Sequence, residues 1–163
     1  MNHEQLFHEM QVELSKMERA VHETDEAIAA LSVVKTPGAH NAIVGGISMN
    51  LHGFYTGVER ILSSIATHVD KNLPSGTKWH QDLLIQMSSS VERIRPLVLS
   101  ADTLAELRAF LAFRHVVRNN YAHALDVEKV LEDASRLTSC FHHFAADCLA
   151  FQQSLTDASN SKA

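Results

Sequence analysis

The feature that most constrains the fold is a spacing of three to four positions between apolar residues, sustained along most of the chain. A repeat near 3.6 residues places apolar side chains on one face of an α-helix. Between residues 2 and 34 the repeat comprises Leu6, Met10, Leu14, Met17, Val21, Ile28 and Leu31. No segment shows the strict alternation of a half-buried strand, and the sequence therefore predicts an all-α protein.

A second long helix is predicted over residues 40–71, after the sequence Thr36-Pro37-Gly38 has ended the first. Its apolar face is broad, which indicates contact with several helices or with a partner chain. A glycine inside a helix costs about 1 kcal/mol relative to alanine. We therefore expect either another backbone packed closely on this helix or a kink near its start. Its glycines are Gly45, Gly46, Gly53 and Gly57.

Three further helices are predicted in the second half of the chain. Trp79 and Met87 bracket a short helix that follows a loop at residues 72–77. Residues 91–100 are expected to form a helical turn and then a loop, because the residue before Pro96 is biased away from helix. Ser100 or Asp102 caps the next helix, and a last helix begins at Asp126. The prediction is an antiparallel four-to-five-helix bundle, with one domain over residues 1–155 and a flexible polar tail over residues 156–163.

The most polar stretch with few carboxylates is the segment 113–126, which precedes the last helix. If the segment is helical, Arg114 and Arg118 lie at i and i+4 and share one surface with His115. Like charges at this spacing cost a few tenths of a kcal/mol, so an anionic group is expected to lie against them. That group is either a bound phosphate or carboxylate, or glutamates of a neighbouring helix, and the spacing leaves both open.

His123 follows Arg118 by five positions, which is about 140° around an ideal helix. The two side chains can therefore meet at one atom only if the helix ends between them or if a second copy of the chain completes the site. Asp126, followed by the apolar residues Val127 and Val130, is typical of a helix N-cap. We expect a break just before Asp126, with His123 in the turn.

Composition narrows the class of protein. The chain has 163 residues, 45% of them hydrophobic and 20% charged, and a formal net charge of -5. This charge argues against general coating of nucleic acid, although a local basic site remains compatible with it. We see no signal peptide and no apolar run long enough for a membrane span, so a cytoplasmic protein is expected.

The cysteines and histidines give no sign of a metal or cofactor site. Cys140 and Cys148 are expected to be buried, reduced residues of a helix. Eleven histidines occur without the close spacing to Cys, Asp or Glu that metal sites show. We expect solvated or hydrogen-bonded histidines, no bound metal and no cofactor.

The residues of the segment 113–126 resemble a known family. The sequence from Arg118 to His123 is similar to the R-x4-H signature of HEPN domains, and the wider segment resembles their HepT-like branch. The likeness extends through residues 50–60 and 79–87 and covers roughly residues 27–155.

Arginine and histidine suffice for metal-independent cleavage of RNA, in which the ribose 2′-OH attacks the adjacent phosphate. His123 is expected to move the proton and Arg118 to stabilise the charge of the transition state. The resemblance implies a ribonuclease toxin that acts at a composite site in a homodimer, is paired with a minimal nucleotidyltransferase antitoxin, and cleaves RNA, which is tRNA in some relatives. Supporting or substrate-binding roles are expected for Arg114, His115, Asn119 and Tyr121.

The chain departs from the family pattern in one position. Related toxins resemble R-x4-H-x-Y, in which the antitoxin AMPylates the tyrosine, but Leu125 occupies that position here. The departure argues against control by AMPylation more than it argues against the nuclease chemistry. His115 with Arg118 is a rival pair for the reaction. The alternative function is a non-catalytic helical module whose arginines bind a nucleotidyltransferase-like partner.

Overall fold

The chain is an all-helical bundle, as the apolar spacing predicts. The computed structural model describes residues 2–119 and 126–160, with only the backbone for residues 114–119. Five α-helices and one π-helical turn make up the regular structure of these residues, and no strand occurs among them. None of the helices in this part of the chain combines the length and the apolar character that a membrane span requires.

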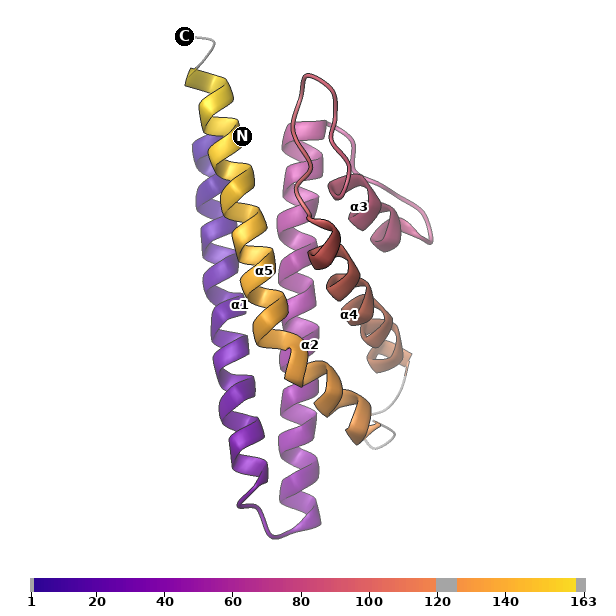
Figure 1. Ribbon diagram of the computed structural model, residues 1–163. Helices are drawn as coiled ribbons and strands as arrows, with labels where there is room; N and C mark the ends of the chain where they lie inside the picture. Colours follow the sequence, from indigo (N-terminus) through magenta and orange to yellow (C-terminus); the bar gives the residue numbers. More distant parts are fainter. Residues whose placement is uncertain (1, 120–125, 161–163) are drawn as a thin grey trace.

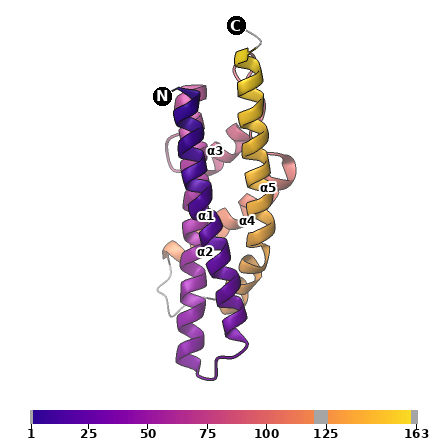
Figure 2. The ribbon, with the colours of Figure 1, turned by 90° about the vertical axis from the view of Figure 1, so that its left-hand side faces the viewer.

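The two long helices α1 (His3–Leu31) and α2 (Pro37–Ile65) form an antiparallel hairpin along one side of the molecule (Figures 1 and 2). The loop between them, residues 32–36, lies about three residues earlier than the sequence indicates. Pro37 does not follow the first helix as a terminator but opens α2, where its missing N–H costs nothing. Thr36 caps the helix, accepting a hydrogen bond from the Ala39 N–H at 3.3 Å.

The expected close contact at the α2 glycines is found for one glycine among the four. A Cβ at Gly57 would lie 2.6 Å from Met17 Cγ, so this residue lets α1 approach α2 closely. Nothing lies within 4 Å of a Cβ at Gly45, Gly46 or Gly53, and α2 continues as a helix through all of them. The helix therefore does not fray at Gly45 and Gly46. A π-helical turn (Ala66–Asp70) ends this arm of the hairpin.

The short helix α3 (Trp79–Met87) and the loop after it are held by one buried arginine. Residues 91–95 form a tight turn closed by the bond from the Val91 N–H to the Arg95 carbonyl, rather than a helix. Arg95 donates five hydrogen bonds, two of them to the Asp70 carboxylate at 2.5 and 2.7 Å. The other three reach the carbonyls of Gln86, Ser89 and Pro96. All five guanidinium N–H groups are thereby satisfied.

The helices α4 (Ala101–Asn119) and α5 (Val127–Asn160) complete the bundle. In Figure 1 the upper part of α5 runs beside α1, and α4 lies on the opposite side of α2 from α1. α5 continues through residues 156–160, the first part of the stretch expected to be a flexible tail. The core contains both cysteines, as predicted, and burial raises the pKa of each thiol well above its usual range.

Candidate functional site

The helix that carries the arginines, α4, begins at a polar cluster shared with α5. Ser100 accepts a hydrogen bond from the Thr103 N–H at its side-chain oxygen, which confirms Ser100 as the cap. The Asp147 carboxylate in turn accepts from the Ser100 N–H at 2.8 Å and from its hydroxyl at 3.0 Å. The start of α4 is therefore fixed to the middle of α5.

A second contact fixes the direction of the two helices. His143 of α5 bonds Glu106 of α4 at 3.0 Å. This hydrogen bond raises the pKa of His143, because the carboxylate stabilises the imidazolium. The first contact joins Ser100 to Asp147, and the second joins Glu106 to His143. Residue numbers thus rise along α4 while they fall along α5, so the two helices are antiparallel.

The inner face of α4 continues toward the arginines. Leu107, Phe110 and Leu111 are buried, and Phe54 of α2 packs against Phe110 with ring centroids 5.5 Å apart. Positions one turn after Phe110 and two turns after Leu111 are 114 and 118. By helical periodicity the backbone positions 114 and 118 therefore follow the same line along α4 as these apolar residues.

The predicted site residues themselves mostly fall outside what the structure describes. The backbone is helical to Asn119, and α5 begins at Val127, so the motif begins in the last described turn of α4. Asp126 caps α5 as predicted, accepting from the Lys129 N–H at 3.2 Å. The structure describes the backbone but not the side chains of Arg114, His115, Arg118 and Asn119. Three further residues lie wholly outside the described part: Tyr121, His123 and Leu125.

A cavity of about 450 Å³ opens between α3 and the middle of α4. Its walls include Leu84 and Ile85 of α3 and Leu111 and Ala112 of α4, with Arg108 and Gln81 as polar groups. Along α4 the stripe formed by Arg108, Leu111 and Ala112 continues, by helical periodicity, to position 115. This cavity therefore adjoins the part of the helix that carries the predicted site.

A buried pair that the sequence analysis missed lies between α2 and α3. The Glu59 carboxylate hydrogen-bonds Nδ1 of His80, and both side chains are about nine-tenths buried. A carboxylate on the apolar stripe of α2, between Val58 and Ile61, is the signal that could have singled out Glu59. His80 fits the expectation of hydrogen-bonded histidines. The pair can hold or move a proton in the interior, beside the helix that packs on α4.

A second interior carboxylate was also missed. Asp133 of α5 is 1% exposed and receives one hydrogen bond, from Lys129 to Oδ1 at 3.1 Å. Its other oxygen, Oδ2, is buried and has no hydrogen-bond partner within residues 2–119 and 126–160.

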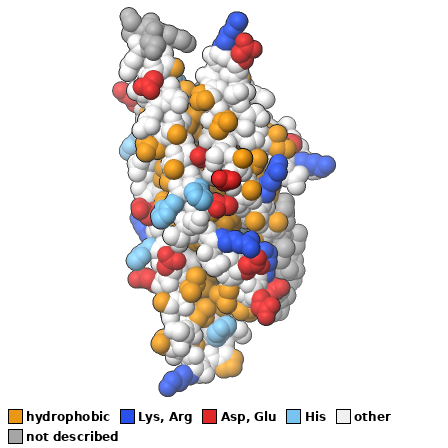
Figure 3. All heavy atoms as spheres, viewed as in Figure 1, with side chains coloured by type: hydrophobic (Ala, Val, Ile, Leu, Met, Phe, Trp, Pro, Cys, Tyr) orange, Lys and Arg blue, Asp and Glu red, His pale blue; other side chains and the backbone are white. Residues whose placement is uncertain are grey.

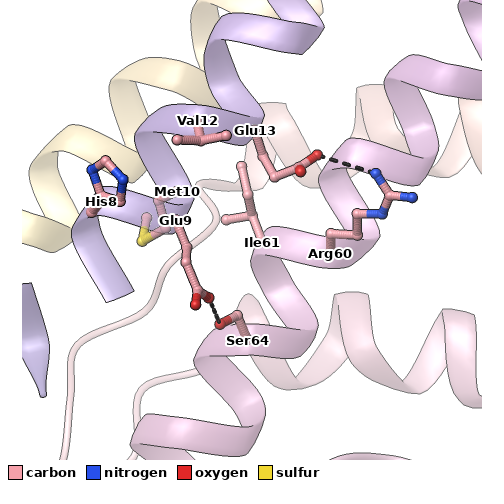
Figure 4. A pocket seen from close by; sticks show the side chains of 8 residues that line it. All are labelled: His8, Glu9, Met10, Val12, Glu13, Arg60, Ile61 and Ser64. Carbon is pink, nitrogen blue, oxygen red and sulfur yellow. Dashed lines mark hydrogen bonds and ion pairs between the residues drawn. The ribbon is translucent and has the colours of Figure 1, made fainter. Parts of the chain in front are cut away.

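A cavity of about 390 Å³ on the other side of the molecule lies between α1 and α2 (Figure 4). Its apolar wall includes Met10 and Ile61. The polar groups at its rim pair with one another, Glu13 with Arg60 at 3.5 Å and Ser64 with Glu9 at 3.4 Å. These mutual pairs leave little charge for a ligand.

The face drawn in Figure 3 shows no large basic patch on its described residues. Among residues whose placement is described, no three His, Cys, Asp or Glu side chains gather as metal ligands. On the face drawn in Figure 3, basic and acidic side chains are scattered among larger hydrophobic and uncharged areas. The described part of this face therefore has no extended surface of one charge.

Comparison with known families identifies the family of the chain, which the described side chains alone do not. The family model described as HepT-like protein matches residues 46–155, well over half of the 163-residue chain. The chain belongs to the HepT-like family. The match confirms the resemblance to HepT-like HEPN domains drawn from the motif, and it includes the arginine-bearing part of α4 and the start of α5. The chain matches no curated protein and no solved structure. The first helix of this HepT-like protein, α1, lies outside the matched residues.

Proposed function

We propose that this HepT-like protein is a metal-independent endoribonuclease, the toxin of a toxin–antitoxin pair. The observation that carries the proposal is the family match across the segment that contains Arg118 and His123. The helix boundaries support it. The backbone at Arg118 belongs to α4, and α5 is capped at Asp126, so the described helices leave room for the break that the pairing of these two residues requires.

The chemistry needs only these residue types. A general base removes the proton of the ribose 2′-OH, and the 2′-oxygen bonds to the adjacent phosphorus. The bond from phosphorus to the 5′-oxygen then breaks, and a general acid gives that oxygen a proton. The products are a 2′,3′-cyclic phosphate and a 5′-OH end. In this scheme His123 transfers protons and Arg118 stabilises the charge on the phosphorane-like transition state. DNA lacks the 2′-OH and is spared.

The site is proposed to be composite, made by two copies of the chain. A homodimer would bring two Arg118 and two His123 side chains into one cleft and supply separate groups for the acid and the base. Arg114, His115, Asn119 and Tyr121 would bind the substrate. The cavity between α3 and α4, with Arg108 on its wall, gives room for a nucleotide next to the site. The domain is proposed to span residues 1–155.

A second candidate function is a helical module without catalysis, which binds a nucleotidyltransferase-like antitoxin through its arginines. The net charge of -5 and Leu125, at the position of the tyrosine that antitoxins modify in related toxins, favour it. Under the first proposal, this leucine means that the cognate antitoxin blocks the site without AMPylating that position.

Cleavage of total RNA in EDTA tests the two candidates. The wild-type protein is expected to cut RNA without added metal, and Arg118→Ala and His123→Ala are expected to lose at least about 100-fold in rate, as removal of a general acid–base group or a charge-stabilising donor does. His115→Ala removes the rival histidine and, as a change at a substrate-binding residue, is expected to raise KM while cleavage is retained. A folded wild-type dimer that leaves every RNA intact would reject the nuclease and favour the module.

A further inference from the structure

Arg108 of α4 is exposed, and its side chain has no hydrogen bond or ion pair to a described residue. By contrast, Arg60, Arg95 and Arg136 each pair with a carboxylate. A guanidinium is permanently charged, and its N–H donors match the oxygens of phosphates and carboxylates. Within the described part of the chain, Arg108 is therefore a cation that remains available to an anionic ligand.

The cavity of about 450 Å³ between α3 and α4 has Arg108 on its wall, and no carboxylate of the described residues lines it. Three other cavities, in contrast, each have at least one carboxylate on their walls, Glu9 in two of them and Asp157 in the third. The net charge of the chain is -5. On such an acidic protein, a cavity whose charged group is an arginine favours an anion, because the nearest charge dominates the local potential.

The rest of the cavity wall is largely apolar. Leu84 and Leu111 are buried, and Ile85 is 50% exposed. Gln81 adds an amide whose side chain, like that of Arg108, has no hydrogen bond to a described residue. A ligand that fits this wall combines an anionic group, an apolar surface and a hydrogen-bonding edge. A nucleotide of RNA has all three, as a phosphate, the flat face of a base and the edge of that base.

The cavity and the candidate site lie along the same helix. The backbone of α4 is helical from Arg108 through position 118, and a helix rises about 1.5 Å per residue. Position 118 is therefore about 15 Å along the axis from Arg108 and about 9 Å from Ala112, which also lines the cavity. Stacked nucleotides advance about 3.4 Å each, so about three to four of them cover this length. One strand that follows α4 can thus reach both places.

We propose that the cavity between α3 and α4 is a subsite for single-stranded RNA, in which Arg108 binds a backbone phosphate and Ile85 contacts the base. The nucleotide in it lies about three to four positions from the cleaved bond. The amide of Gln81 meets the edge of the same base. Because phosphate contacts carry no sequence information and bases in a duplex are paired and stacked, the subsite selects unpaired RNA rather than a particular sequence.

The phosphate contact is tested by binding, with a single-stranded RNA of about ten nucleotides whose 2′-OH groups are all methylated, so that it stays intact. Arg108→Gln is expected to weaken binding by about fivefold, as loss of an exposed charge contact does. It is also expected to lower the salt dependence, the slope of log Kd against log salt concentration, by about 0.7, the value for one phosphate contact on a single strand.

Arg19→Gln is the matched control. It removes the same charge at an exposed arginine of α1, which likewise has no ion pair to a described residue, and it is expected to change neither the affinity nor the slope. A wild type that does not bind this RNA, or an Arg108→Gln variant that binds as tightly as the wild type, would overturn the proposal. So would an equal loss in Arg19→Gln, because binding would then follow net charge. Weaker binding with an unchanged slope in Arg108→Gln would overturn the phosphate contact.

Two further variants test the cavity without removing the arginine. Ala112→Glu places a carboxylate at i+4 from Arg108, at an exposed position of the wall, where it pairs with the guanidinium. It is expected to weaken binding as Arg108→Gln does, and unchanged affinity would overturn the subsite. Ile85→Gln is expected to weaken binding with an unchanged slope, whereas Leu149→Gln, the same type of change at a comparably exposed residue of α5, is expected to have no effect. Equal affinities for these two variants would overturn the base contact.

The distance of the subsite from the cleaved bond rests on the proposed ribonuclease function and is tested by kinetics. A dinucleotide spans the cleaved bond alone, so the wild type is expected to show a lower KM for the longer unmethylated RNA than for the dinucleotide. Arg108→Gln is expected to narrow that difference, with kcat within about twofold of wild type. An unchanged difference would overturn the placement. If the wild type cleaves no RNA, the proposed function fails, while the methylated RNA still decides whether the cavity binds a strand.

Discussion

Replacing Arg95 with methionine is expected to destabilise the whole protein, although Arg95 lies outside the family motif. Methionine is similarly long but has no donor, so the change removes five hydrogen bonds at once. Asp70, whose side chain is 4% exposed, would keep only the bond from Gln86 at 2.6 Å. The loop that leads into α4 would lose its main anchor.

The size of the effect follows from burial. Removing one partner of a buried ion pair costs about 3–5 kcal/mol, because the other charge stays buried and unpaired. For a chain of this length each kcal/mol corresponds to about 2–4 °C in Tm, so a loss of about 6–20 °C is expected. The assay is urea and thermal unfolding followed by circular dichroism, at a fixed protein concentration because self-association would shift the midpoint.

Two further variants make the test specific. Arg93→Met makes the same substitution two residues away at a side chain that is 90% exposed and is expected to cost less than about 1 kcal/mol. Asp70→Asn combined with Arg95→Met is expected to recover part of the loss, since no buried charge then remains without a partner. If Arg95→Met costs no more than Arg93→Met, the assignment of the network as an anchor is wrong.

Two other predictions follow from contacts of α2 and α5. Gly53→Ala is expected to stabilise the protein by about 0.5–1 kcal/mol, because a helix favours alanine and nothing lies near the new methyl group. Gly57→Ala is expected to destabilise it, because its Cβ would lie 2.6 Å from Met17 Cγ; equal effects in urea unfolding would contradict this. The imidazole of His143 is expected to titrate in NMR above its ordinary pKa near 6.5 and to return toward it in Glu106→Gln. Because the folded-state pKa is raised, the stabilisation by this pair is full below the unfolded pKa and is lost as pH rises through the folded pKa. A titration unchanged by Glu106→Gln would contradict the pairing.

The helices themselves were predictable from sequence to within a few residues. Their apolar spacing is a local property of the chain, and so are the caps at Ser100 and Asp126, which the structure confirms. The start of α2 was misplaced because Pro37-Gly38 is typical of a helix end, whereas proline in the first turn of a helix is equally stable. Local chemistry did not distinguish these two uses.

The candidate site was predictable in part. The segment from Arg118 to His123 suggested the family, and the family match confirms that resemblance. The assignment of Arg118 and His123 as the reacting pair stays a prediction, since their side chains lie outside the described residues. Spacing along α2 could single out Glu59 but not its partner His80, because that contact depends on how two helices pack. The burial of Asp133 likewise depends on residues from other helices.

The sequence by itself determined where the helices form, how they are capped and which family the chain resembles, because those features depend on residues within a few positions of one another. Tertiary structure decided which polar residues meet in the interior. Arg95 and Asp70 are 25 positions apart, and Glu59 and His80 are 21 apart. Whether such residues touch depends on how each helix is rotated about its axis when it packs. That rotation is chosen by the fit of the whole core, which no single helix contains.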